Sequence, residues 1–184
     1  MTAFPITLET PVAHTATLPK SADVVIIGGG VIGVSTAYFL AKSGVSVVLL
    51  EKGRIAGEQS SRNWGWIRQM GRDLAELPIM IEANALWQKL ALDVQADIGL
   101  QQCGLTYFSG SEAESAGFEA WIAEARPMGV DSRILSSGEV ADMFPGMTAR
   151  FHGAMHTPSD MPAEPWAALP ALARAAARHG AVII

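Results

Sequence analysis

Residues 23–51 constrain the fold of this chain more than any other stretch, and they read DVVIIGGGVIGVSTAYFLAKSGVSVVLLE. An apolar run at 24–27 leads into the glycine-rich turn GGGVIG at 28–33, and a segment of helical character follows. A second apolar run at 45–50 ends at the acidic residue Glu51. A strand, a glycine turn, a helix, a second strand and a terminal carboxylate make up the βαβ unit that binds dinucleotides. The sequence therefore predicts an α/β fold of the Rossmann type.

The glycines of this turn and the acidic residue have separate chemical roles. Gly28 permits the tight turn out of the first strand, and Gly30, which lacks a Cβ, lets the backbone approach a pyrophosphate. Gly33 allows the helix to pack closely on the strand, and the helix N-terminus offers its N–H groups to the phosphates. The carboxylate of Glu51 is placed to accept hydrogen bonds from a ribose diol, which disfavours the 2′-phosphate of NADP. An ordinary α/β domain with a glycine-rich turn is the alternative interpretation.

The composition narrows the class of protein further. The chain has 184 residues, 49% of them apolar, which is enough for one sizeable core. Its formal net charge of −5 offers no basic surface, so we do not expect nucleic-acid binding. Cys103 is the single cysteine, which excludes an intramolecular disulfide and fits a reducing, cytoplasmic compartment. The histidines are scattered along the sequence, and we expect no metal site.

Apolar periodicity and turn residues predict the remaining elements. Residues 52–71 form a long polar stretch, and loops of this length inside compact domains are usually functional. Pro78 is expected in the first turns of a helix or at a kink. Because the chain stops within an apolar run, where a further strand would begin, we expect an incomplete N-terminal part of a longer protein. Helices are predicted at 31–42, 73–98, 112–126, 137–143 and 166–179, and strands at 104–109, 132–135, 151–157 and 181–184.

Four segments carry a resemblance to a known family: GGGVIG at 28–33, TAYFLAKSG at 36–44, VSVVLLEK at 45–52 and GEQSSRNWGWIRQ at 57–69. Together they resemble the FAD-dependent amine and amino-acid oxidoreductases, which include glycine oxidase, sarcosine oxidase and the D-amino-acid dehydrogenases. The last segment is the most specific, because simple Rossmann-type NAD enzymes have no such loop after the second strand. The resemblance covers most of residues 23–184.

The resemblance implies a Rossmann-like FAD-binding domain of the glutathione-reductase type and the start of an α+β substrate domain. Residues 1–22 would then be a leader or a strap over the domain, and 23–99 the first part of the FAD-binding domain. Residues 100–162 would begin the substrate domain, and 163–184 would return to the FAD-binding domain as a helix and a strand. The implied reaction oxidises the C–N bond of an amino acid or secondary amine by hydride transfer to flavin N5, giving an imine.

The resemblance also implies which residues bind the cofactor. The turn and the returning loop at 59–61 would contact the pyrophosphate, whereas residues 51–52 would contact the ribose and adenine end. Residues 64–66 would approach the isoalloxazine. The full set implied for FAD is Gly28, Gly30, Val31, Ile32, Gly33, Glu51, Lys52, Gln59, Ser60, Ser61, Trp64, Gly65 and Trp66.

Two arginines complete the implied site. Arg68 would lie near the flavin and favour its anionic reduced form, and Arg72 would bind a substrate carboxylate. Because Asn63 and Trp64 stand where some relatives carry a flavin-linked histidine, the FAD is expected to be non-covalent. From the residues alone, two other roles stay open: core packing for the tryptophans and surface charge for the arginines.

The remaining expectations concern partners and rival functions. We expect an amine or amino-acid substrate and an electron acceptor, which is either oxygen or another carrier whose use would allow weak membrane association. An NAD-dependent dehydrogenase is the first alternative function, because NAD and FAD share the ADP half that the glycines and Glu51 would recognise. A non-catalytic subunit or fragment is the second, and a C-terminal part or a partner subunit would then complete the enzyme.

Overall fold

The structure of the protein, a computed structural model, describes residues 5–184 and divides the chain into two compact units. The first unit contains the residues up to Gly65 together with 88–100 and 163–184, and the second contains 66–87 and 101–162. The predicted breaks near 100 and 162 lie beside unit boundaries, whereas residues 66–87, expected in the first domain, belong to the second unit. The assignment of these units to cofactor and substrate stays a prediction.

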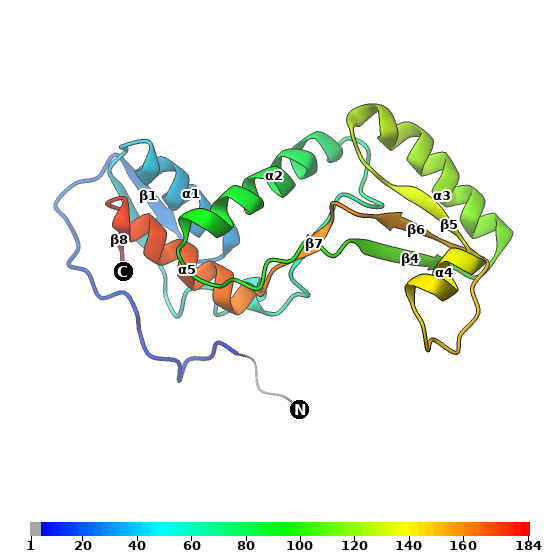
Figure 1. Cartoon of the computed structure of the whole chain (residues 1–184). Coiled ribbons are helices and arrows are strands. Elements are labelled where there is room, and N and C mark those ends of the chain that lie inside the picture. Colours follow the sequence, from blue (N-terminus) through cyan, green and yellow to red (C-terminus); the bar gives the residue numbers. More distant parts are fainter. Residues whose placement is uncertain (1–4) are drawn as a thin grey trace. The chain divides into compact units, whose positions relative to one another are not determined.

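A parallel three-stranded sheet with the order β1-β2-β8 organises the first unit (Figure 1). The strands are β1 (Val24–Ile27), β2 (Val47–Leu50) and β8 (Val182–Ile183). Helix α1 (Val31–Lys42) connects β1 to β2, and helix α5 (Pro165–Arg178) precedes β8. The βαβ unit predicted from the glycine turn is therefore present.

Helices α1 and α5 pack against each other, and their sequences explain why. The buried residues Val34, Ala37, Tyr38 and Ala41 follow the spacing of one helix face on α1. Most buried residues of α5 are alanines, whose small side chains let two helices approach closely. The hydroxyl of Tyr38 donates to the Asp93 carboxylate at 2.7 Å. Asp93 is the last residue of helix α2 (Leu77–Asp93), so this bond connects α1 to the end of α2.

An antiparallel sheet with the order β4-β6-β5 organises the second unit (Figure 1). Helix α4 starts at a capping box, in which the side chains of Ser136 and Glu139 accept each other's backbone N–H. Helix α3 packs on the sheet through Ile122, which joins Met70 and Met155 in a buried cluster. The elements are β4 (Leu105–Ser109), α3 (Glu112–Ala125), β5 (Arg133–Ser136), α4 (Ser137–Met143) and β6 (Gly153–Thr157).

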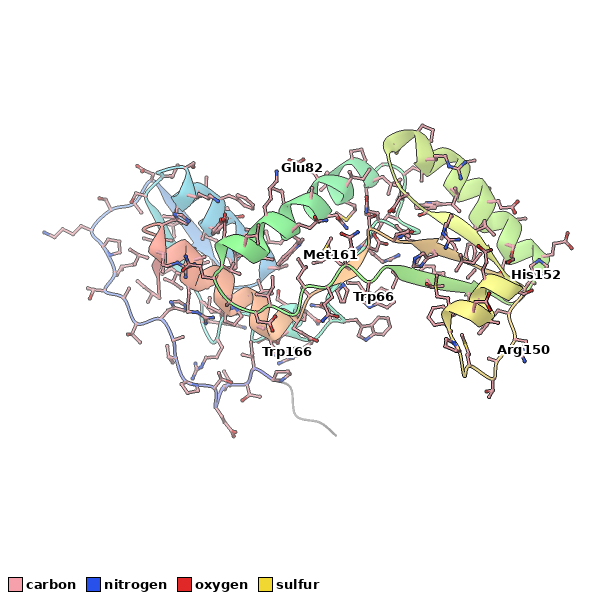
Figure 2. The ribbon with its side chains drawn as sticks, viewed as in Figure 1. Trp66, Glu82, Arg150, His152, Met161 and Trp166 are labelled. Carbon is pink, nitrogen blue, oxygen red and sulfur yellow. The ribbon has the colours of Figure 1, made fainter. Side chains whose placement is uncertain are left out.

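A short ribbon in the second unit was not predicted from the sequence. Strand β3 (Trp66–Ile67) pairs antiparallel with β7 (Met161–Pro162), and Figure 2 labels Trp66 and Met161 of the two strands. The sequence predicts no strand between the one at 151–157 and the helix at 166–179, so it missed β7. Proline has no backbone N–H to donate to a β ladder, so Pro162 argues against a strand when the sequence is read alone. Proline is nevertheless tolerated in an edge strand such as β7.

The long helix α2 (Leu77–Asp93) is shorter than the predicted 73–98. Pro78 lies in its first turn, where the missing N–H removes no intrahelical bond, as expected. Two 3₁₀ turns, η1 (Gln59–Ser61) and η2 (Arg126–Met128), complete the elements.

The N-terminal segment carries no helix or strand between residues 5 and 22. The first four residues of the predicted leader lie outside the described part of the chain. Within residues 5–184, no helix is both long and apolar enough to cross a bilayer.

Candidate functional site

The glycine turn between β1 and α1 is the first element of the candidate cofactor site. Gly28 has φ +104°, a conformation that favours glycine, and its N–H donates to the Leu50 carbonyl at 2.8 Å. A Cβ on Gly33 would lie 2.0 Å from the Gly28 carbonyl oxygen, so the fold itself requires glycine there. A Cβ on Gly30 would instead meet the Ser60 hydroxyl, at 3.0 Å, and no other described residue within 4 Å. Gly30 therefore leaves room for a close approach to the backbone.

The Glu51 carboxylate lies beside this turn, as the sequence predicted. Its Oε2 accepts the Gly29 N–H at 2.6 Å, and its Oε1 accepts the Gly53 N–H at 2.6 Å. Its backbone N–H donates to the Ile184 carbonyl at 2.8 Å, which fixes the residue at the edge of the sheet. A carboxylate oxygen has two acceptor positions, so these bonds leave capacity for sugar hydroxyls.

The loop after β2 folds back onto the N-terminus of α1. The Val31 N–H, the first of the helix, donates to the Ser60 hydroxyl at 2.9 Å. The Ser61 hydroxyl is buried without a hydrogen-bond partner among residues 5–184. Asn63 braces the loop, since its amide donates to the Gln59 carbonyl at 3.1 Å. A helix N-terminus with the Ser60 hydroxyl beside it fits the oxygens of a bound pyrophosphate.

The other predicted cofactor residues of the first unit are solvent-exposed. Ile32 is 79% exposed at the start of α1. Lys52 reaches Glu58 at only 4.0 Å, and such exposed ion pairs contribute little to stability. Gln59 is exposed in η1.

The fold explains why residue 65 is a glycine, and this explanation is separate from the role that the resemblance implies. A Cβ there would lie 2.0 Å from the Ala163 carbonyl oxygen, and the Ala163 N–H donates to the Gly65 carbonyl at 3.0 Å. Close backbone packing therefore already requires this glycine. The neighbouring Trp64 is 80% exposed and Trp66 is 41% exposed, so the alternative of core aromatics is wrong.

Arg68 lies in the second unit beside two neighbouring aromatic rings. Its guanidinium carbon is 6.0 Å from the Trp66 ring centroid and 5.8 Å from that of Tyr107. Its Nη1 donates to the Met70 carbonyl at 2.7 Å and to the Tyr107 hydroxyl at 2.8 Å. These contacts fix the cation in place, so the alternative of a solvated surface charge is wrong for Arg68. A cavity of about 110 Å³ adjoins it, lined also by Cys103.

Asp160, which sequence reasoning missed, holds the segment that follows Arg68. Its buried carboxylate accepts the Gln69 N–H at 2.7 Å and the Met70 N–H at 3.1 Å. Burial raises the pKa of this carboxyl above its ordinary value, and the two backbone bonds oppose that rise. A lone aspartate next to a proline-rich stretch gives no signal of such a role, because its partners are distant in the sequence.

The contacts that Arg72 makes within the second unit are contacts that hold the fold. Its Nη1 lies 3.6 Å from the Glu76 carboxylate, and its carbonyl accepts the Trp121 indole N–H at 2.9 Å. Its Nε is buried without a hydrogen-bond partner among residues 5–184. The implied contact with a substrate carboxylate stays a prediction.

Known proteins resemble this chain in sequence over most of its length. Residues 23–184 match the family described as FAD dependent oxidoreductase. Mitochondrial sarcosine dehydrogenase of Mus musculus is 28% identical over 180 residues, covering 95% of this chain and 19% of that protein. The mitochondrial pyruvate dehydrogenase phosphatase regulatory subunit of Mus musculus is 30% identical over 177 residues, covering 95% of this chain and 20% of that protein.

A solved structure extends the likeness to three dimensions. L-amino acid deaminase from Proteus myxofaciens, in complex with anthranilate, has a TM-score of 0.88 and 30% identity. The match covers 92% of this chain and 39% of that chain. The present chain thus spans about a fifth of the two curated relatives and under half of the solved one.

Proposed function

Because the chain belongs to the FAD-dependent oxidoreductase family, we propose that it contributes the nucleotide-binding part of a flavoenzyme that oxidises an amino acid or secondary amine. The family and the α/β fold predicted from the sequence are confirmed. When bound, FAD supplies the hydride acceptor, and the protein supplies binding, orientation and charge. The relatives named above include a sarcosine dehydrogenase and an L-amino acid deaminase, which supports an amine or amino-acid substrate.

One observation carries the proposal: a carboxylate lies against a glycine turn at the carboxyl ends of the strands of a parallel sheet. Glu51 contacts the backbone of Gly29 and stands where a ribose diol would bind. Gly30, Val31 and Ile32 would meet the pyrophosphate at the N-terminus of α1. The loop residues Gln59, Ser60 and Ser61 would add polar contacts, and Lys52 would lie toward the adenine.

The residues proposed for the ring and substrate are those at 64–66, Arg68 and Arg72. Trp64 and Trp66 offer exposed aromatic surface, and Gly65 sets the path of the chain between them. Arg68 keeps a fixed positive charge, which stabilises negative charge on a reduced cofactor or on a substrate carboxylate. Arg72 is proposed for the substrate carboxylate on the resemblance alone.

Titration with two nucleotides tests this proposal. The purified 184-residue chain should bind FAD with a change in flavin fluorescence, and NADH should bind much more weakly because the loop at 57–69 is not part of a simple NAD site. Tight NADH binding without FAD binding would favour the dehydrogenase alternative instead. Oxidation of a panel of amines by the complete protein then tests the reaction.

A non-catalytic role is the second candidate function. It is favoured by one observation, that a relative covering 95% of this chain is named as a regulatory subunit. Such a protein would retain the nucleotide site but show no amine oxidation when complete and loaded with FAD. The electron acceptor and the cytoplasmic location stay predictions, the latter because two relatives are named as mitochondrial.

A further inference from the structure

The N-terminal arm, residues 5–14, and the body of the first unit together line a partly open cavity. The cavity has a volume of about 270 Å³. From the arm it is lined by apolar side chains that include Ile6 and Val12. From the body it is lined by Trp166 at the start of α5, labelled in Figure 2, and by Ile183 of β8. The arm is thus one wall of a largely apolar cavity.

Arg54, in the loop after β2, binds the arm through hydrogen bonds. Its Nε donates to the Thr10 carbonyl, and its Nη2 donates to the Leu8 carbonyl at 2.8 Å. Its Nη1 donates to the Gly53 carbonyl at 3.0 Å. A planar guanidinium that binds two carbonyls of one segment fixes both the position and the direction of that segment. The arm is therefore held against the unit by a specific anchor.

The cavity is continuous with the proposed ribose site, because Glu51 lines it as well. In a nucleotide the base is joined to the ribose on the side away from the phosphates. With the phosphates at the N-terminus of α1 and the ribose at Glu51, the base is the part of the nucleotide that reaches this cavity. A mostly apolar cavity with few polar groups suits a flat heterocycle.

His14 is a polar residue of the arm beside the cavity. It lines the cavity, and its Nε2 is buried without a hydrogen-bond partner among residues 5–184. Burial, and then the charge of Arg174, lower the pKa of His14. Because the Nε2 nitrogen has almost no accessible surface, it faces the protein rather than the cavity, and the apolar side chains of the arm are left to contact the base.

We propose that the N-terminal arm is one wall of the adenine pocket, and that the apolar side chains of residues 5–14 bind the base of the nucleotide. This inference rests on the proposed function, since it requires an adenine nucleotide at Glu51. It goes further in assigning part of the cofactor affinity to a segment that precedes the βαβ unit.

A matched pair of substitutions in the arm tests the proposal. Val12 and Leu18 are both exposed apolar residues, 54% and 64%, but Val12 lines the cavity and Leu18 does not. Val12→Trp should fill the cavity and weaken binding of FAD and of ADP by about tenfold, as measured by calorimetry on the full chain. Leu18→Trp should leave both affinities unchanged.

Two further variants distinguish the loss of the arm's attachment to the first unit from the filling of the cavity. Removal of residues 1–14 should weaken ADP binding at least as much as Val12→Trp. Arg54→Lys should weaken it less and should speed hydrogen exchange in residues 5–14, because lysine cannot reproduce the fork. Equal ADP affinity in the wild type and Val12→Trp, with FAD still bound, would overturn the inference alone. A full chain that binds neither FAD nor ADP would instead overturn the proposed function, and the inference with it.

Discussion

The glycine turn of the first unit and the Arg68 segment of the second are held by contacts of different range. At the turn, Glu51 bonds Gly29 from 22 residues away, and Ser60 bonds Val31 from 29 residues away. In the second unit, Asp160 bonds Gln69 from 91 residues away. The side-chain contacts of the first site therefore come from a single βαβ unit and its following loop, with Ile184 as a distant backbone contact of Glu51, whereas the side-chain contact of the second comes from a distant segment. Substitutions should damage the two sites in different ways.

The largest expected effect is at Gly33 in the turn. Gly33→Val would place a Cβ 2.0 Å from the Gly28 carbonyl oxygen, so the turn must open or the helix must shift. We expect a loss of about 3 kcal/mol or more in the free energy of unfolding, measured with urea. Gly117→Ala on α3 is the control, because its Cβ would meet no described residue within 4 Å. That variant should gain about 0.5–1 kcal/mol from helix propensity, and a similar loss in both variants would contradict the packing argument.

The next effect probes the long-range contact. Asp160→Asn keeps the side-chain volume but turns an NH₂ group toward one of two buried backbone N–H donors. The free energy of unfolding should fall by about 2–3 kcal/mol, the cost of leaving buried groups unsatisfied. Asp131→Asn, at an exposed residue that accepts from Ser159, should cost far less. If the two losses are equal, Asp160 does not hold the Arg68 segment.

The difference in range also explains what the sequence predicts. The βαβ unit and the position of Glu51 follow from local pattern and spacing, and the return of the 59–61 loop follows from the family resemblance; the structure has them together. The β3–β7 ribbon and the role of Asp160 could not be predicted, because they arise from pairing between segments about 90 residues apart. Hydrophobic periodicity gives no register for such pairs, and a two-residue strand has no period.

A smaller effect concerns the cofactor rather than the fold. Glu51→Ala should weaken FAD binding by about 1–3 kcal/mol, because charge-assisted contacts to the ribose are lost. Glu58→Ala removes a nearby exposed carboxylate and should leave the affinity unchanged. Fluorescence titration with FAD compares the two variants, and an equal loss in both would show only a change in local charge.

Ser60→Ala should have a modest effect on stability. It removes the hydroxyl that accepts the Val31 N–H, and the loss of a group bonded to a helix N-terminus costs about 1 kcal/mol. Thermal unfolding in the absence and presence of FAD measures this. Bound cofactor should reduce the difference between the wild type and the variant, since a phosphate oxygen would then accept that N–H.

The smallest effect is a pH dependence at the surface of the first unit. The hydrogen bond from Lys42, and then that from Tyr38, lower the pKa of Asp93 below its ordinary 3.8. A lowered folded-state pKa stabilises the protein above the unfolded value, and this contribution is lost as the pH falls through the folded-state pKa. The stability difference between the wild type and Asp93→Asn should therefore shrink on acidification below 3.8. A difference independent of pH would contradict this linkage.

Binding of FAD to Gly30→Val tests the central claim most directly. Unlike Gly33, Gly30 meets only a short serine side chain among the described residues, so the fold should tolerate the change better than the cofactor does. We predict that the variant keeps the wild-type circular dichroism spectrum but binds FAD about two orders of magnitude more weakly, with Gly30→Ala intermediate. Wild-type affinity for FAD in a folded Gly30→Val chain would contradict a pyrophosphate site at this turn.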